Sequence, residues 1–286
     1  MESPSRRARG FTLIEVVVVL LIFGFILAMA AAVTRGVLAS QKRTTTSTRM
    51  AGVDAALVQF AMQQKRLPCP ADGTLASSDN NAGVEGGRNA AGCTGNQQNG
   101  VVPWRALALS EGDATDGWDH RLTYRLDPAL GADSGMDMSW CDPIGTSALV
   151  GGKCNTACVS TNAAACTPPA TFLAGRGLTV KTVAGVVVMD PAAVVPTGAA
   201  YVVISAGESG GGAYPFNSNG IVTSSTVGDG NEELKNYASQ PYVAGVTYYV
   251  DDTISDAAGA THFDDIVSRP SILSVATKAG IAPRTH

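Results

Sequence analysis

Residues 9–33 read RGFTLIEVVVVLLIFGFILAMAAAV, and this stretch decides the fold of the N-terminal part of the chain. From Phe11 to Val33 there is one charged residue, Glu15, in a run that is otherwise almost entirely apolar. As a helix these 23 residues would extend about 34 Å, which is long enough to cross the hydrocarbon core of a bilayer. A carboxylate inside such a segment costs roughly 2.5–3.5 kcal/mol even on insertion scales. Glu15 therefore needs a functional reason.

Three fates of this segment fit the residues. It has the basic head, the apolar middle and, with Ala28 and Ala30, the A-x-A site of a cleavable signal peptide, although a Glu at the start of the apolar run is unusual for one. It also fits a simple membrane anchor, or a segment that is cut at its near edge and retained. The positive-inside rule does not settle its orientation, because basic residues stand on both sides: Arg6, Arg7 and Arg9 before it, and Arg35, Lys42, Arg43 and Arg49 after it.

Residues 9–15, RGFTLIE, followed by the apolar run, resemble the class III signal of type IV prepilins and type II secretion pseudopilins. The resemblance implies that a membrane-embedded prepilin peptidase cuts between Gly10 and Phe11 and N-methylates Phe11. It also implies that Glu15 meets the N-terminal amine of a neighbouring subunit and selects the register of the helices as a filament grows. Such pairing makes a buried carboxylate tolerable, and the Phe11 amine also shares a helix face with Glu15 of its own chain. The alternative is that Glu15 merely lies at the headgroup boundary.

Apolar residues continue beyond this segment at spacings of three and four, which is the pattern of an amphipathic helix. A polar, Thr-rich stretch at 40–48 interrupts the pattern, and Pro68 ends it. We predict one helix over residues 11–66, with a transmembrane half at 11–33 after a leader at 1–10, and an amphipathic half at 34–66 that packs on a sheet. The residues of the stripe are Val37, Leu38, Met50, Val53, Leu57, Phe60, Ala61 and Gln64.

The six cysteines lie in loops rich in Gly, Asn and Thr, and an even number in such loops is typical of disulfides in an oxidising compartment. We expect Cys69 to pair with Cys93, and the other four to pair among themselves. The C-x3-C spacing of Cys154 and Cys158 leaves zinc as an alternative, although no second pair with histidine at ligand spacing follows. The four remaining cysteines are Cys141, Cys154, Cys158 and Cys166.

Composition limits the function of residues 67–286, which form the predicted globular domain. The chain has a net charge of −4 and 15% charged residues, so it lacks the basic footprint of a nucleic-acid-binding protein. It is also too hydrophobic to be disordered. The disulfides place this domain outside the cytoplasm.

Turns and strands alternate along the domain. We predict a short helix or a turn at 103–107, a turn leading into a strand at 118–126, and a Cys-rich insertion at about 127–169. Strands are predicted at 178–189, 199–205 and 243–250, followed by a capped C-terminal helix that ends by Gly280. Residues 116–124, 203–207 and 264–266 are similar to segments of pseudopilin domains. The fold class is therefore predicted to be α+β: a long N-terminal helix packed on an antiparallel sheet, pilin-like, with a disulfide-rich insertion.

The resemblance also implies a metal, because the loops near the acids at 264–266 bind calcium in major pseudopilins. Four residues could supply the hard oxygen ligands that calcium prefers, but no D-x-D-x-D-G loop is present, and solvated acids without a cofactor are the commoner explanation of such residues. These residues are Asp252, Asp256, Asp264 and Asp265.

Residues 207–211, GESGG, look like the nucleophile loop of trypsin-like proteases, and His120 and Asp190 precede Ser209 in the order that those enzymes use. However, Glu208 replaces the usual Asp, and the segment around His120 is unlike the histidine segment of that family. We interpret 207–211 as a glycine-rich loop after a strand, and we expect no catalytic residues.

These observations predict a structural subunit, a minor pilin or pseudopilin, rather than an enzyme. It would be a single-pass inner-membrane protein with its head in the periplasm, or at the cell surface in a filament. The resemblance implies as partners a prepilin peptidase, other pilin or pseudopilin subunits, an inner-membrane assembly platform with its ATPase, and membrane lipid. Two alternatives remain: a tip adhesin that binds through the Cys-rich insertion, and a membrane-anchored periplasmic protein that forms no filament.

Overall fold

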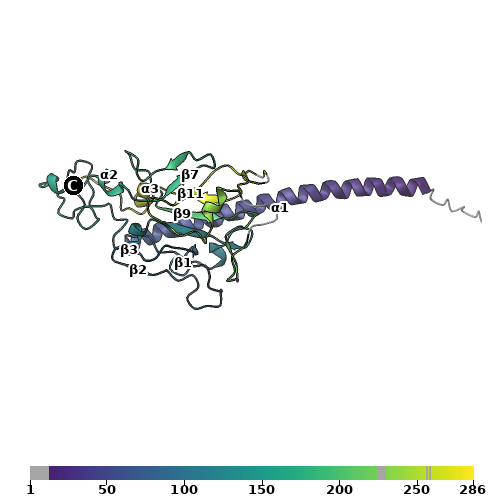
Figure 1. Ribbon diagram of the computed structural model, residues 1–286, viewed down its shortest axis with the longest axis horizontal. Helices are drawn as coiled ribbons and strands as arrows, with labels where there is room; N and C mark the ends of the chain where they lie inside the picture. Colours follow the sequence, from purple (N-terminus) through teal and green to yellow (C-terminus); the bar gives the residue numbers. More distant parts are fainter. Residues whose placement is uncertain (1–12, 224–229, 256, 258) are drawn as a thin grey trace, which may run out of the picture. The chain divides into compact units, whose positions relative to one another are not determined.

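The computed structural model describes residues 13–223, 230–255, 257 and 259–286 (Figure 1). For residues 30–35 it describes the backbone only. The chain divides into two compact units, Met1–Arg43 and Thr44–His286. The predicted cleavage site at Gly10 and Phe11 lies outside the described residues, and so does Asp256.

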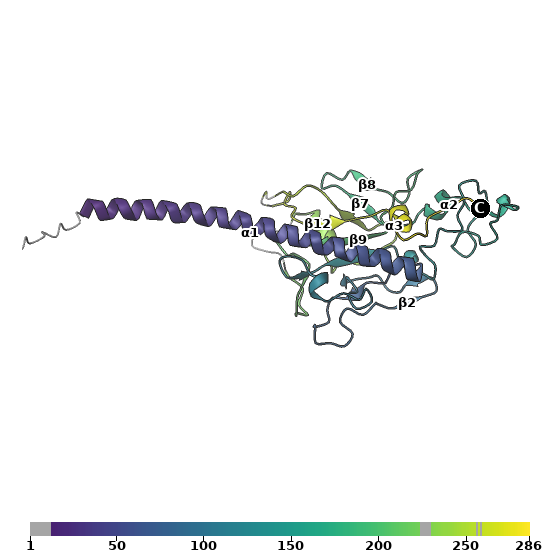
Figure 2. The same cartoon turned by 180° about the vertical axis from the view of Figure 1, so that it is seen from behind.

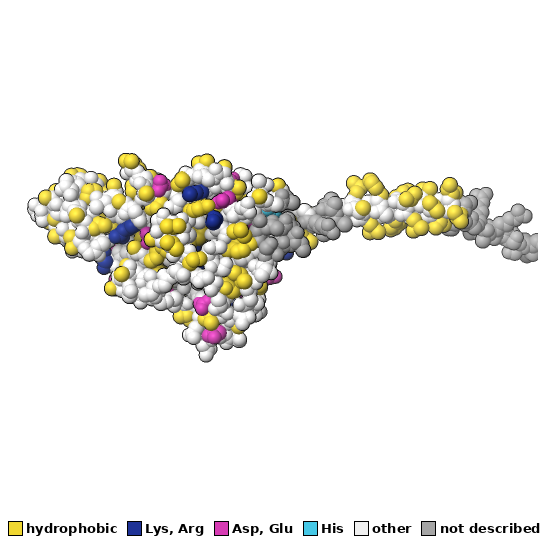
Figure 3. Space-filling model, viewed as in Figure 1, with side chains coloured by type: hydrophobic (Ala, Val, Ile, Leu, Met, Phe, Trp, Pro, Cys, Tyr) yellow, Lys and Arg dark blue, Asp and Glu magenta, His cyan; other side chains and the backbone are white. Residues whose placement is uncertain are grey.

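Helix α1 (Leu13–Gln64) confirms the long N-terminal helix over all but a few of its predicted residues. In the first unit its large apolar side chains, from Leu13 to Met29, are 45–84% exposed, and they cover the surface of this unit in Figure 3. Within the described part of the chain, no helix is long and apolar enough to cross a membrane. The membrane span over residues 11–33 stays a prediction.

The second unit is built on a five-stranded sheet in which every pairing is antiparallel. Its centre is the pairing of β6 with β9, which runs from Thr123 opposite Ile204 to Leu126 opposite Tyr201. In order across the sheet, the strands are β1 (Ala71–Asp72), β4 (Gly100–Val101), β6 (Thr123–Leu126), β9 (Tyr201–Ser205) and β12 (Ile266–Ser268). The predicted α+β class is confirmed.

The amphipathic part of α1 packs on this sheet because its apolar residues recur on one face. Figure 2 shows this part of the helix lying across the sheet. Met50, Val53, Leu57 and Ala61 are buried in the main core cluster, which also contains side chains from β6 and β9. Phe60 packs at the edge of this core and Gln64 is exposed, so the predicted stripe is buried in its central positions.

Smaller elements complete the unit. Strand β11 (Tyr248–Val250) pairs in parallel with β7 (Thr179–Lys181), which pairs with β8 (Val187–Met189), and β5 (His120–Arg121) pairs with β10 (Tyr214–Pro215). Helix α3 (Ile272–Lys278) confirms the predicted C-terminal helix, and Ser271 caps it by accepting a hydrogen bond from Ser274 N. The remaining elements are β2 (Arg88–Asn89), β3 (Gly92–Cys93), α2 (Pro169–Leu173), and 3₁₀ turns at Gly112–Ala114, Pro128–Gly131, Ala163–Ala165 and Glu233–Asn236.

All six cysteines form disulfides. Cys69 is bonded to Cys93, as predicted, and the other bonds are Cys141–Cys154 and Cys158–Cys166. Cys154 and Cys158 belong to different disulfides, so neither is available as a thiolate ligand and the zinc alternative for this pair is wrong.

Asp54 joins α1 to the sheet and should make the stability of this packing depend on pH. Its carboxylate accepts hydrogen bonds from the Tyr201 hydroxyl at 3.0 Å and the Ser268 hydroxyl at 2.6 Å. Burial raises the pKa of Asp54 above its ordinary 3.8, and the two hydroxyl groups only partly offset this. Because the folded chain holds this proton more tightly than the unfolded chain, the contribution is fully present below pH 3.8 and is lost as the pH rises through the folded pKa.

We therefore expect Asp54→Asn to remove one component of the pH dependence of the free energy of unfolding above pH 3.8. Urea unfolding at a series of pH values measures this. The matched control is Glu208→Gln, which changes an exposed carboxyl group and should leave the profile unaltered. A profile that is identical in Asp54→Asn and in the unaltered chain would contradict the assignment.

Candidate functional site

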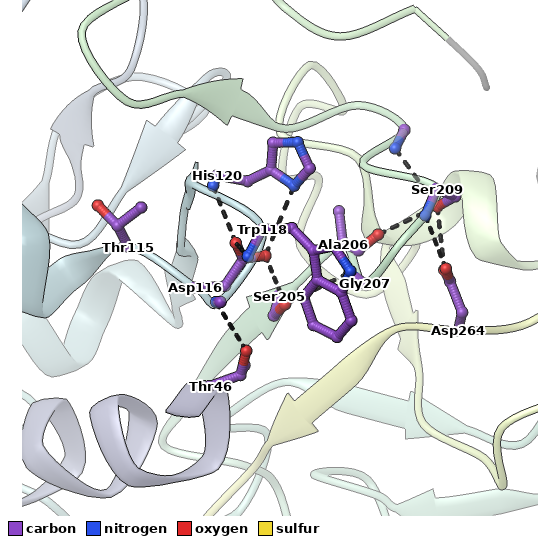
Figure 4. A network of polar contacts seen from close by, with 12 residues as sticks. Thr46, Thr115, Asp116, Trp118, His120, Ser205, Ala206, Gly207, Ser209 and Asp264 are labelled. Carbon is purple, nitrogen blue, oxygen red and sulfur yellow. Dashed lines mark hydrogen bonds and ion pairs between the residues drawn. The ribbon is translucent and has the colours of Figure 1, made fainter. Parts of the chain in front are cut away.

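A buried carboxylate organises the turn that precedes β5. Oδ1 of Asp116 accepts hydrogen bonds from Trp118 N at 2.8 Å and His120 N at 2.9 Å. Oδ2 accepts one from the Ser205 hydroxyl at 2.7 Å, at the end of β9. Figure 4 shows these contacts, with Nδ1 of His120 at 3.6 Å from Oδ2 of Asp116. The turn is thereby fixed to the central strand of the sheet.

The same turn holds α1. Gly117 N donates to the Thr46 hydroxyl at 2.9 Å, and the Arg49 guanidinium donates to the carbonyl oxygens of Thr115 at 3.1 Å and Asp116 at 2.8 Å. We call residues 115–120 the collar, because their backbone forms hydrogen bonds with Thr46 and Arg49 of the helix. The collar contains the D-G-W segment that sequence similarity had singled out, and it links the helix to β9.

The glycine-rich loop at 206–212 follows β9 and lies beside the collar (Figure 4). Gly207 and Gly210 have φ values of 57° and 67°, a conformation that favours glycine. A Cβ atom on Gly207 would lie 2.4 Å from the Asp264 carbonyl oxygen, and one on Gly210 would lie 2.5 Å from Cε1 of His120. Only glycine fits at these two places.

Ser209 is bound to an acid. Its backbone N donates to Oδ2 of Asp264 at 2.7 Å, and its hydroxyl contacts Oδ1 of Asp264 at 2.9 Å and the Ala206 carbonyl at 3.0 Å. His120 has Asp116 as its acidic neighbour, and Asp190 caps a turn by accepting from Ala192 N. These contacts support the interpretation of 207–211 as a structural loop.

Three side chains of the kinds that bind metal ions lie close together, and one of them, Asp264, contacts this loop through Ser209. The side chains of Glu233, His262 and Asp264 are buried, and each offers an atom within 4.8 Å of the other two. Nδ1 of His262 lies 3.0 Å from Oε2 of Glu233, and Asp264 N donates to Oε1 of Glu233 at 2.8 Å. Burial raises the pKa of Asp264 to about 6, and the neighbouring Glu233 carboxylate adds to the rise.

The predicted calcium ligands do not form such a group among the described residues. Asp252 accepts hydrogen bonds from Val183 N and Thr253 N, and Oδ2 of Asp265 accepts one from the Asn236 amide. Asp264 lies instead with Glu233 and His262, which sequence reasoning missed. Glu233 and His262 do not stand in a sequence spacing that is typical of metal ligands. Calcium stays a prediction.

Glu15 lies in the first turn of α1 as the structure describes it, and its side chain is exposed in the single chain. A negative charge at a helix N-terminus is favourable, because the helix dipole is positive there. Phe11 is outside the described residues, so the pairing of its amine with Glu15 stays a prediction.

Comparison with known protein families gives a match near the N-terminus of the chain. Residues 5–31 match the family described as the prokaryotic N-terminal methylation motif. No curated protein matches the chain, and no solved structure matches it. The match covers the segment around Gly10, Phe11 and Glu15 from which the resemblance was drawn. The chain thus carries the N-terminal methylation motif, which is the class III prepilin signal.

Proposed function

We propose that the chain is a minor subunit of a type IV pilus or a type II secretion pseudopilus, and that it acts by assembling rather than by catalysis. The observation that carries the proposal is the methylation motif at residues 5–31, with Glu15 inside it. The motif implies processing by a prepilin peptidase and assembly with other pilin-type subunits. The α+β unit Thr44–His286, which includes the second part of α1, is the head that such a subunit would carry.

The exposed apolar part of α1 supports a role in a helix bundle. Large apolar side chains from Leu13 to Met29 are 45–84% exposed, and exposed apolar area costs roughly 25 cal/mol per Å² in water. Before assembly, lipid of the inner membrane would cover these side chains. In a filament the helices of neighbouring subunits would replace the lipid, and the assembly platform with its ATPase would drive the transfer.

Glu15 would then set the register. Cleavage after Gly10 creates an amine on Phe11, and this amine is the cation that a buried Glu15 needs. Each incoming subunit would be accepted where its amine meets the carboxylate of a neighbour. The three disulfides support a head that folds in the periplasm, since such bonds persist in oxidising compartments.

The first test is the intact mass and N-terminal residue of the chain, expressed with and without a prepilin peptidase. We expect a start at N-methylated Phe11 only when the peptidase is present. A start at Ala31 in both cases would show an ordinary signal peptide. An uncut chain in both cases would show a simple anchor. Either of these two results would overturn the proposal.

Glu15→Gln should prevent assembly without affecting cleavage. The amide keeps the shape of the side chain but removes its charge, and breaking a buried ion pair costs about 3–5 kcal/mol. We therefore expect incorporation into filaments to fall by at least roughly 100-fold, while the mature N-terminus still forms. Quantitative immunoblotting of sheared filaments and membranes measures this. The matched control is Glu208→Gln in the head, which should assemble normally; equal assembly of both variants would refute the role of Glu15.

A further inference from the structure

We infer that Glu233, His262 and Asp264 form a binding site for a divalent transition metal of the zinc class. This inference goes beyond the proposed function and does not depend on it. The three side chains come from two stretches of chain, the 3₁₀ turn Glu233–Asn236 and the loop before β12. Their ligand atoms lie within 4.8 Å of one another, and the residues are only 1%, 5% and 5% exposed.

The charges of the group favour a cation. Glu233 and Asp264 are buried carboxyl groups, and among the described residues neither forms an ion pair with a lysine or arginine. Glu233 contacts His262 instead, through Oε2 of Glu233 and Nδ1 of His262. Burying a carboxylate is costly, and buried charges are commonly paired or bound to a metal. A divalent cation would balance both carboxylates at once.

The donor set identifies the class of metal. Imidazole nitrogen and carboxylate oxygen are both ligands of Zn²⁺, which binds such atoms at about 2.0–2.2 Å. Calcium takes about 6–8 ligands, all of them oxygen. The separation of 3.0 Å between Nδ1 of His262 and Oε2 of Glu233 is compatible with two ligands on one small ion. The inferred ion therefore differs from the predicted calcium in its chemistry and in two of its ligands.

The ligands are also held in position. Ser209 donates to both oxygens of Asp264, and Glu233 accepts from Gly230 N at 2.9 Å and from Asp264 N at 2.8 Å. Hydrogen bonds of this kind orient the side chains that bind directly to the metal in metal sites. An ion here would fasten the glycine-rich loop, the 3₁₀ turn and the approach to β12 to one another.

The test uses the full chain, purified in a mild detergent and freed of metal with a chelator. Titration calorimetry with Zn²⁺ should give one equivalent bound per chain, and Co²⁺ should give the visible absorption of a coordinated nitrogen–oxygen site. His262→Gln should weaken zinc binding by at least roughly 10-fold, because lost supporting groups alone cost 10–100-fold. His286→Gln is the matched control, since the His286 ring stacks on Trp140 and His286 is not one of the three grouped residues, and it should bind zinc normally.

Three outcomes would overturn the inference: no uptake of zinc or cobalt, equal zinc binding in His262→Gln and the unaltered chain, or binding of calcium that zinc does not displace. If His262→Gln fails to fold, Asp264→Asn and the cobalt spectrum of the unaltered chain decide the question. A cobalt spectrum that is the same as that of the free aqueous ion would count against the site.

Discussion

Gly10→Val is expected to leave the chain uncut by a prepilin peptidase. The methylation motif spans this position, and glycine is suited to the cut because it has no side chain to obstruct the protease. We expect the rate of processing to fall on the order of 100-fold or more, which corresponds to about 2.7 kcal/mol in the transition state. Without the cut there is no amine on Phe11, so Glu15 lacks its cation and assembly should fail as well. Intact mass after co-expression with the peptidase measures the result.

The matched control for this experiment is Gly24→Val in the same helix. A Cβ atom at Gly24 meets nothing within 4 Å, so the added side chain should neither disturb the fold of the chain nor block cleavage. Processing of Gly10→Val at the rate of the control would show that cleavage does not occur after Gly10. It would also remove the basis for the role given to Glu15.

Asp116→Ala should destabilise the head more than any other single change considered for it. The carboxylate accepts hydrogen bonds from Trp118 N, His120 N and the Ser205 hydroxyl, and Asp116 is fully buried. Removing it leaves three donors without their acceptor, and each unsatisfied buried group costs about 1–3 kcal/mol. We expect a loss of about 4 kcal/mol in the free energy of unfolding, measured by urea denaturation with tryptophan fluorescence.

Two further variants test the reason for this loss. Asp116→Asn keeps an acceptor for the two backbone N–H groups, so it should lose clearly less stability than Asp116→Ala. Glu208→Ala changes an exposed side chain and should stay within about 0.5 kcal/mol of the unaltered chain. If Asp116→Ala were as stable as Glu208→Ala, the hydrogen bonds accepted by the Asp116 carboxylate would not be what stabilises the head.

The sequence predicted the features of the fold that depend on residues close together in the chain, namely the buried face of α1, the C-terminal helix and one disulfide. The three- and four-residue spacing of Met50, Val53 and Leu57 indicated the buried face of α1, and the helix predicted to end by Gly280 corresponds to α3, which ends at Lys278. Cys69 and Cys93 stand at the two ends of one loop, so their disulfide could also be predicted from the sequence. In each case the physical cause lies within a short stretch of chain.

Features that depend on distant contacts were not predicted. A turn leading into one strand was expected at 118–126, but the strand part is divided into β5 and β6, because β5 pairs with β10 and β6 pairs with β9. Strand β12 was missed because three residues after two acids carry too little pattern, and only its pairing with β9 defines it. Glu233 and His262 meet across 29 positions, a proximity that no spacing rule reveals.

The Cys69–Cys93 bond closes shortly after the last turn of α1, and Gly131 lies against both of its sulfur atoms, where a Cβ would be 2.5 Å from Sγ of Cys93 and 3.2 Å from Sγ of Cys69. The head is therefore built around an oxidised pair at the junction with its helix. A freshly inserted chain with reduced thiols would lack this closure. The number of competent subunits would then follow the activity of the cell's thiol oxidants, and the growth of any filament would follow the oxidising capacity of the envelope as well as the rate of synthesis.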